Sequence, residues 1–185
     1  MYNFWGVVFV LIMKLNYNNK IIKHHSFNEL SEAKKFYSNQ KSRNKCFLDD
    51  TFGDNHCVIN SLDALSGEIY LSLGFSSERN SNELNLMLWE QADRWVIEID
   101  ESIYIVSSRS AEIVTKFEIG TPLIGFYVIE NRLLVLEETN IKVLDREGNV
   151  FQEKTIDLID SYSLTDDGVL NIISTEGEES QISLF

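Results

Sequence analysis

The sequence predicts a mainly β protein of the α+β class, with an N-terminal hairpin and one helix followed by antiparallel meanders that resemble an open, partial β-propeller. Three observations lead to this fold class. Short apolar runs, most of them four to seven residues long, recur at even spacing from residue 93 onward. Asp, Glu, Asn, Ser and Gly residues separate them, as in strands joined by tight turns. The pattern also repeats after 35 to 38 residues, close to the length of one propeller blade.

The chain opens with an apolar run from Phe4 to Met13. Its β-branched and aromatic residues favour a buried strand, with Gly6 as a possible bulge. Ten residues are too few for a membrane-spanning helix, which needs about 20. Two alternatives stay open, a signal-like segment and a later start at Met13. The pair Asn18-Asn19 predicts a turn into a second strand at 20–24.

One helix is predicted, over residues 27–38. Ser26 and Glu29 have the spacing of a capping box, in which each side chain bonds the exposed backbone N–H of the other residue. Apolar side chains then recur at helical spacing, at Phe27, Leu30, Ala33 and Phe36. The polar stretch 39–56 reads as a loop and as the border between two parts of the chain. We therefore expect an N-terminal strand, hairpin and helix part at 1–56, and a blade-like antiparallel β part at 57–185 that forms one compact unit with it.

The blade-like part begins with strands predicted at 57–62, 68–75 and 84–89. Turns are predicted at Asp145–Asn149, where Gly148 is able to take a positive φ, and at Asp166–Gly168. The regular apolar runs that follow residue 93 lie at 95–99, 103–106, 113–119, 126–129, 133–136, 141–144, 150–156, 162–164, 169–173 and 182–185.

Residues 94–106 match residues 132–144 at an offset of 38, and later pairs such as Ile124 and Ile159 match at 35. A truncated third copy starts at Gly168. The alternative is a plain β-meander whose similarity reflects alternation alone, and it gives the same fold class.

Charge is distributed unevenly along the chain. The 185 residues include 16 Lys and Arg against 29 Asp and Glu, a net charge of −13. Residues 1–90 hold nine basic and ten acidic side chains, whereas 91–185 hold seven and 19. This balance argues against a nucleic-acid binder, which needs clustered cations to neutralise phosphates. The acidity serves solubility alone, or it forms a surface that attracts a basic partner.

The sequence indicates no metal, no cofactor and no catalytic residue. The soft ligands are His24, His25, His56, Cys46 and Cys57, and they lack the paired spacing of zinc sites. Adjacent strand residues point to opposite faces, so His24 and His25 cannot share an ion, and His56 cannot activate Cys57. No glycine-rich phosphate loop occurs. The two cysteines do not indicate a disulfide, and we expect a reducing, cytoplasmic location without membrane association.

Three stretches carry a resemblance to a known family: 132–138 (RLLVLEE), 141–148 (IKVLDREG) and 157–164 (DLIDSYSL). Together they make residues 93–185 resemble the acidic, blade-like β modules of small bacterial immunity proteins from contact-dependent inhibition and related polymorphic toxin systems. The resemblance implies a non-enzymatic antitoxin that binds a cognate toxin domain, commonly a basic nuclease. It further implies an acidic surface that occludes the active site of the toxin.

The predicted partner-binding residues are exposed carboxylates with two aromatic anchors: Glu137, Glu138, Asp145, Glu147, Asp157, Asp160, Asp166 and Asp167, with Tyr104 and Tyr162. Core positions are expected for Trp95 and Tyr127. Two other functions stay open. A scaffold domain would carry carboxylates spread evenly over its surface. A small-molecule binder or hydrolase would have a deep cleft with converging His56, Cys57 or carboxylates.

Overall fold

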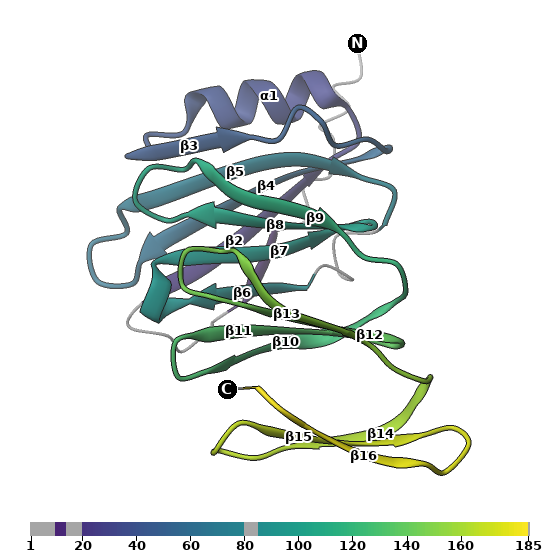
Figure 1. Cartoon of the computed structure of the whole chain (residues 1–185). Coiled ribbons are helices and arrows are strands. Elements are labelled where there is room, and N and C mark those ends of the chain that lie inside the picture. The colour runs from purple at the N-terminus through teal and green to yellow at the C-terminus, as the bar shows by residue number, and fades with distance from the viewer. Residues whose placement is uncertain (1–9, 14–19, 80–84, 185) are drawn as a thin grey trace. The chain divides into compact units, whose positions relative to one another are not determined.

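The computed structural model describes residues 10–13, 20–79 and 85–184 and confirms the mainly β, antiparallel, propeller-like fold class (Figure 1). The chain folds into two compact units, which are described separately. The first comprises Met1–Leu86, Ile97–Asp100 and Val106–Ile113, and the second Met87–Val96, Glu101–Ile105 and Val114–Phe185. Within the described ranges, no helix has the length and apolarity needed to cross a membrane.

The first unit contains a five-stranded sheet in the order β1-β2-β4-β5-β3. All of its pairs are antiparallel except β3 with β5, which is parallel. The strands are β1 (Val10–Met13), β2 (Lys20–Phe27), β3 (Asn44–Phe47), β4 (Asn55–Asp63) and β5 (Ile69–Ser77). The predicted border at residue 56 falls inside this sheet, because β2 pairs along β4 from Lys20↔Asp63 to Phe27↔His56.

Helix α1 (Leu30–Asn39) covers one face of this sheet. Ala33 is fully buried against Phe27 and Val58, with Phe36 and Tyr37 packed around them. The ring of Phe36 also lies 4.5 Å from that of His25, measured between centroids. His24 is buried and belongs to the opposite face of β2, as the alternation of strand side chains predicts.

Three local predictions in this region were wrong. The helix starts at Leu30 rather than residue 27, and its N-cap Glu29 makes no side-chain capping bond. Ser26 cannot form the predicted capping box because it lies within β2, paired with Cys57. The predicted loop 39–56 contains strand β3. Of the predicted strand Phe4–Met13, Val10–Met13 is β1, whereas Gly6 and the Asn18-Asn19 turn lie outside the described residues.

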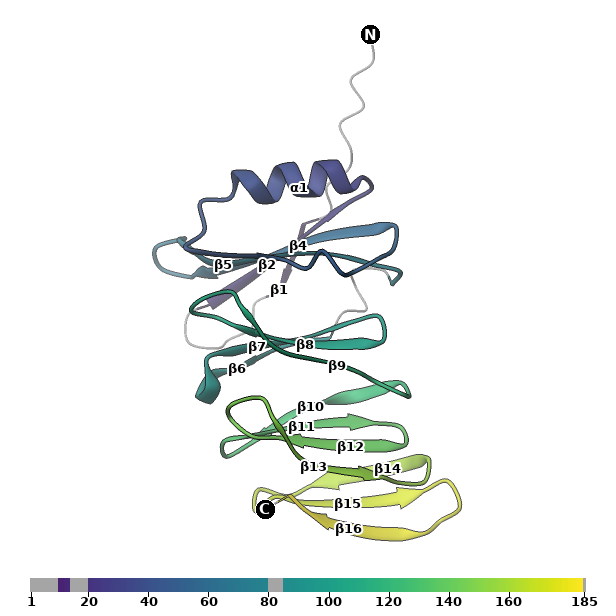
Figure 2. The same ribbon diagram turned by 45° about the horizontal axis from the view of Figure 1, so that its top comes forward.

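The rest of the chain forms three antiparallel sheets of consecutive strands (Figure 2). Every apolar run predicted from residue 95 onward contributes to one of their strands, which confirms that part of the prediction. The strands are β6 (Leu86–Trp89), β7 (Arg94–Ile99), β8 (Ser102–Ser107) and β9 (Ile113–Glu118), then β10 (Leu123–Ile129), β11 (Arg132–Glu137), β12 (Asn140–Leu144) and β13 (Val150–Thr155), then β14 (Ile159–Leu164), β15 (Val169–Ser174) and β16 (Glu179–Ser183).

In the second unit, β11 and β12 supply apolar side chains to two successive cores. Leu133 and Val135 belong to the core that includes Val96 and Ile103. Leu134 and Leu136 belong to the next core, with Leu170 and Ile172 of β15.

Residues that match at the 38-residue offset therefore pack on the corresponding face of their own sheet. Val96 packs into the first core, and Leu134, 38 residues later, packs into the second. Ile103 and Ile141 are related in the same way.

The predictions of turns at Asp145–Asn149 and Asp166–Gly168 are confirmed, because Gly148 and Gly168 have φ of 92° and 76°.

The buried position of His24 predicts a pH-dependent stability. Burial, followed by the nearby charge of His25, lowers the pKa of His24 from 6.5 to about 4. The unfolded chain therefore takes up a proton between these values while the folded chain does not. Unfolding free energy should fall as pH drops through this range, by on the order of 3 kcal/mol from His24. Urea unfolding between pH 7 and 5 should show a flatter pH dependence in His24→Leu than in the parent chain, and equal slopes would contradict the assignment.

Candidate protein-binding surface

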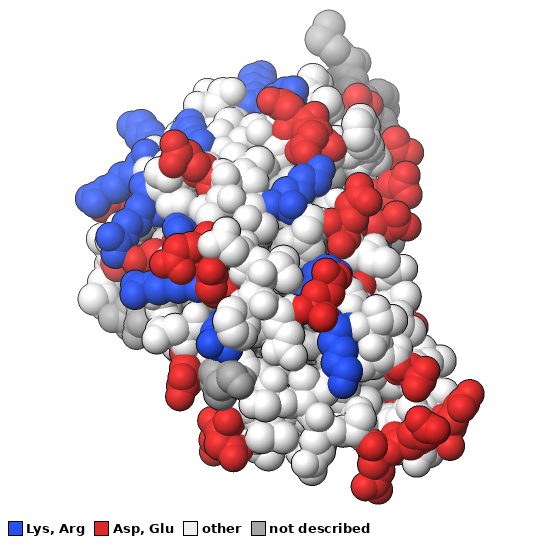
Figure 3. Space-filling model, viewed as in Figure 1, with Lys and Arg blue, Asp and Glu red and all other residues white. Residues whose placement is uncertain are grey.

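Among the four sheets of the described chain, β14–β16 has the largest excess of one charge sign. We call this sheet and its flanking turns, residues 157–184, the acidic end sheet. It contains seven carboxylates and no Lys or Arg: Asp157, Asp160, Asp166, Asp167, Glu176, Glu178 and Glu179. All seven are exposed. Figure 3 shows red residues without blue ones over this sheet.

The preceding sheet lacks such an imbalance. Residues 120–156, which contain β10–β13, hold six acidic and four basic side chains. The acidity of the second half of the sequence is therefore concentrated in its last sheet.

Turns and a bulge hold these carboxylates at the surface. The register of β14 with β15 shifts between Ile159 and Ser161, so Asp160 is the extra residue of a bulge. Asp166 and Asp167 occupy the β14–β15 turn, which the N–H of Gly168 closes by donating to the Thr165 carbonyl at 3.0 Å. Gly177, with φ of 81°, forms part of the turn that carries Glu176 and Glu178, and Glu179 is the first residue of β16.

The two faces of the acidic end sheet differ in polarity. Leu170, Ile172 and Ile182 point into the core shared with β11 and β12. The opposite face includes Ser163, Asn171 and Gln181, which lie in register across the three strands. Ile173, 41% exposed, lies on this face as well, and the rest of the face is mostly polar and compatible with water.

None of the seven carboxylates forms an ion pair with any residue in the ranges 10–13, 20–79 and 85–184. Their charges are therefore left without internal compensation. Such a surface raises the local concentration of cations and speeds the encounter with a basic protein.

Four of the predicted carboxylates belong to the acidic end sheet: Asp157 and Asp160 near the start of β14, and Asp166 and Asp167 in the turn after it. The sequence interpretation missed Glu176, Glu178 and Glu179 on the same sheet. The signal that would have identified them is the complete absence of Lys and Arg after Lys154.

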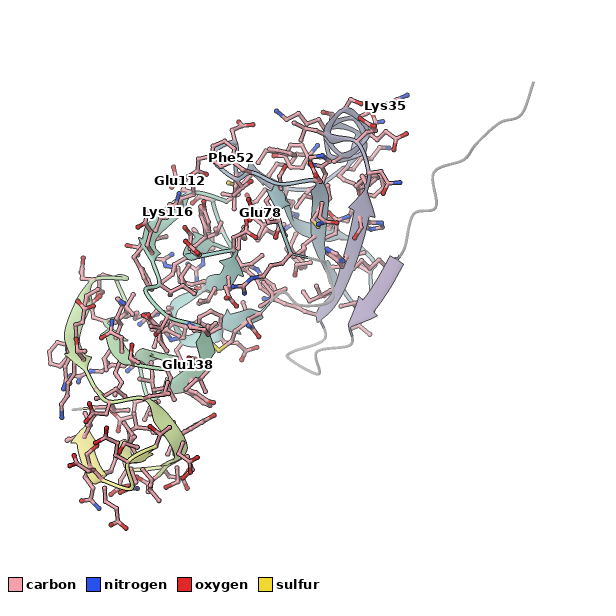
Figure 4. All side chains as sticks on the ribbon, turned by 90° about the vertical axis from the view of Figure 1, so that its right-hand side faces the viewer. Lys35, Phe52, Glu78, Glu112, Lys116 and Glu138 are labelled. Carbon is pink, nitrogen blue, oxygen red and sulfur yellow. The ribbon has the colours of Figure 1, made fainter. Side chains whose placement is uncertain are left out.

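Three other predicted carboxylates belong to the preceding sheet. Glu147 is exposed in the β12–β13 turn, whereas Asp145 and Glu138 are half-buried (Figure 4 labels Glu138). Burial raises the pKa of Asp145, but hydrogen bonds from Asn149, Glu147 and Gly148 together outweigh it and lower the pKa. The backbone N–H of Asn149 donates to the Asp145 carboxylate at 2.8 Å.

Glu137 was wrongly predicted to be exposed. It is fully buried, and its carboxylate accepts a hydrogen bond from Lys142 Nζ at 2.6 Å. The other oxygen accepts the backbone N–H of Gly120 at 2.9 Å and that of Thr121 at 3.3 Å. Glu137 and Glu138 are neighbours at the end of β11, so they point in opposite directions and only one can face outward. Glu137 therefore fixes the β9–β10 connection and is not available to a partner.

Tyr104 was also wrongly predicted to be an exposed anchor. It is 2% exposed, and the Nζ atom of Lys116 lies 4.9 Å from its ring centroid. Trp95 is equally buried, which confirms its predicted core position.

Tyr162, the other predicted anchor, is 37% exposed, and its hydroxyl is hydrogen-bonded to that of the half-buried Tyr127. Burial and this bond raise the pKa of Tyr127 to about 12.

A small cleft of about 180 Å³ adjoins the acidic end sheet. The end of β13, its connection to β14 and the β15–β16 hairpin line it. Asp157, Glu178 and Glu179 contribute carboxylates to the lining, and Lys154 contributes one cation. Clefts for drug-sized ligands measure roughly 300–1,000 Å³, so this one suits a single side chain better than a free small molecule.

The histidine and cysteine residues, which could supply catalytic or metal-binding chemistry, lie outside the acidic end sheet. His56 Nδ1 is 2.9 Å from Ser76 Oγ, and burial raises the pKa of the Cys57 thiol to about 12. This thiol is therefore protonated at neutral pH and is not an activated nucleophile. Over the described ranges, no three His, Cys, Asp or Glu residues are grouped closely enough to hold a metal ion.

Comparisons with known proteins show the fold alone. No protein-family model matches the sequence, and no curated protein sequence is similar to it. Among solved structures, BamB from Moraxella catarrhalis is similar over 95% of this chain, with 12% identity and a TM-score of 0.50. KlHsv2, with its loop 6CD replaced by a Gly-Ser linker, is similar over 69% of this chain, with 10% identity and a TM-score of 0.52. The matched part is 42% of each of those chains.

Buried Glu137 and exposed Glu147 make a matched pair for mutation. Glu137→Gln leaves the charge of Lys142, whose side chain is 10% exposed, with only Glu153 at 3.4 Å. We expect it to lower the unfolding free energy by about 3 kcal/mol, because it leaves a buried charge without its main partner. Glu147→Gln removes the same charge from an exposed turn and should change stability by less than about 0.5 kcal/mol. Urea unfolding at pH 7 measures both, and equal losses would show that Glu137 has no structural role.

Proposed function

We propose that this protein is an immunity protein that binds and neutralises a basic toxin domain, such as a nuclease, by covering the toxin's active site with the acidic end sheet. The observation that carries the proposal is the set of seven exposed carboxylates without an ion-pair partner in the described chain. A nuclease presents Lys and Arg to the phosphates of its substrate. A sheet that presents carboxylates in place of phosphates competes for those cations.

The placement of these charges on regular structure supports this function over general solubility. A protein that needed only solubility could carry its carboxylates evenly, with both signs interspersed. Here one sheet of the second unit contains seven acidic and no basic residues, and its neighbour contains six and four. Because strands and short turns hold the backbone that carries these groups, little loop entropy is lost when a partner binds them.

The alternative functions have less support. A scaffold domain predicts an even spread of carboxylates, which differs from the distribution described above. A hydrolase predicts a deep cleft with buried, converging His56, Cys57 or carboxylates. Neither His56 nor Cys57 lines the cleft beside the acidic end sheet, and the three acidic residues that line it are exposed. The immunity function further implies action in the cytoplasm, where a toxin that acts on nucleic acid would be met.

The proposal predicts how four charge-removing substitutions affect association with a toxin. The test protein is the product of the reading frame beside the gene for this chain, where immunity and toxin genes are paired. Changing Asp157, Asp160, Asp166 and Asp167 to Asn should slow association about tenfold at about 50 mM salt and reduce the effect of raising salt to 300 mM. Stopped-flow fluorescence gives both rates, and inhibition of the toxin's nuclease activity gives the functional readout.

A matched control removes four exposed charges from the other sheets of the second unit, by changing Glu101, Glu118, Glu130 and Glu147 to Gln. It alters the net charge by the same amount and should slow association much less. If the two quadruple variants behave alike, the acidic end sheet is not the binding surface. If the neighbouring product does not bind at all, the immunity function itself is rejected.

A further inference from the structure

The acidic end sheet has one strand fewer than the sheets before it. Sheets β6–β9 and β10–β13 have four strands each, in sequence order, whereas β14–β16 has three. In the second of these sheets, β12 lies between β11 and β13. Its counterpart β16 pairs with β15 only. The position that a fourth strand takes in the other two sheets is thus not filled by any described strand.

The pairing geometry identifies which backbone groups point toward that position. Leu184 N–H donates to the Gly168 carbonyl at 3.0 Å, and Ser174 N–H donates to the Glu178 carbonyl at 2.9 Å. Hydrogen-bonded and non-hydrogen-bonded pairs alternate along antiparallel strands. Ile182 and Ser180 therefore bond to β15, in register with Leu170 and Ile172. The N–H and C=O groups of Gln181 and Glu179 point away from β15.

The acidic cleft lies beside this edge. Glu179 and Ser180 of β16 line it, and Lys154 and Thr155 of β13 line it as well. Its lining carries three carboxylates against one ammonium group, so it attracts a cationic side chain. A segment paired with β16 would have its alternate side chains within reach of the cleft, since side chains of adjacent strands on one face lie about 5 Å apart.

We propose that the edge of β16 that no described strand covers is a β-augmentation site that accepts an extended, basic segment of a partner protein. The backbone of that segment pairs with Gln181 and Glu179, and one of its Lys or Arg side chains enters the acidic cleft. This inference rests on the proposed function, because it specifies the structural form in which the acidic end sheet meets its partner. Main-chain hydrogen bonds supply affinity in this mode, and the side-chain pocket supplies specificity.

Two substitutions at Gln181 separate the backbone contribution from that of the side chain. Gln181→Pro removes the N–H that points to the free edge and leaves the bonds of Ser180 and Ile182 to β15 in place. Gln181→Ala removes the side chain and keeps the N–H. The probe is an acetylated decapeptide of alternating valine and lysine, with a second peptide that has glutamate in place of lysine.

The lysine peptide should bind the full chain and shift the NMR signals of the Glu179 and Gln181 amides. Gln181→Pro should weaken this binding about tenfold or more, and Gln181→Ala less than about twofold. The glutamate peptide should not bind. Changing Asp157, Glu178 and Glu179 to their amides should remove the preference for lysine while the backbone pairing remains.

Several results would overturn the inference. Equal affinity of Gln181→Pro and Gln181→Ala would show that the edge is not used, and equal affinity for both peptides would show that the cleft does not select a cation. If Gln181→Pro does not fold, the lysine peptide N-methylated at alternate residues takes its place, and unchanged affinity rejects the pairing. Self-association that Gln181→Pro abolishes would identify a second copy as the occupant instead. None of these results decides the charge-substitution test of the immunity function, because that test measures association with the product of the neighbouring gene and not the binding of a peptide.

Discussion

A β-sheet with apolar side chains on both faces requires a neighbouring layer on each side, and the second unit follows from this constraint. Leu133 to Leu136 alternate between two cores, and all four are at most 1% exposed. Burying one such side chain contributes about 1.5–3 kcal/mol, so the sheet gains most of its stability only between two others. The end sheet instead has one apolar and one polar face, which makes it suitable for presenting charge to water.

Most of the strands could be predicted from the sequence because they are local features. Each apolar run is bounded by turn residues, and Gly148 and Gly168 follow acidic residues in two predicted turns, where both take a positive φ. Features that depend on distant pairing could not be predicted. Strand β3 is Asn44–Phe47, short and partly polar, and it exists because it pairs with β5. The capping box failed for the same reason, since pairing with β4 extends β2 through Ser26.

The carboxylates of the candidate site show the same difference between local and distant features. Asp166 and Asp167 were predictable because a turn between strands faces solvent. The role of Glu137 was not, because its burial depends on the position of Lys142 and of the Gly120 and Thr121 amides. Carboxylates thus have two roles in this molecule. Buried ones such as Glu137, and Glu98 with Arg79 at 2.7 Å, hold chain segments together, and exposed ones create the surrounding potential.

The edge of β16 that no described strand covers has a consequence for the behaviour of the protein at high concentration. A strand with unpaired backbone groups is a template for growth into fibrils, and natural proteins protect such edges with charge. Here Glu179 lies in the edge strand and the other six carboxylates lie elsewhere on the same sheet and its turns, so two copies of this sheet repel each other as they approach. The carboxylates that would attract a basic partner therefore also act as gatekeepers against aggregation. Colloidal stability and partner selection are then properties of the same seven side chains.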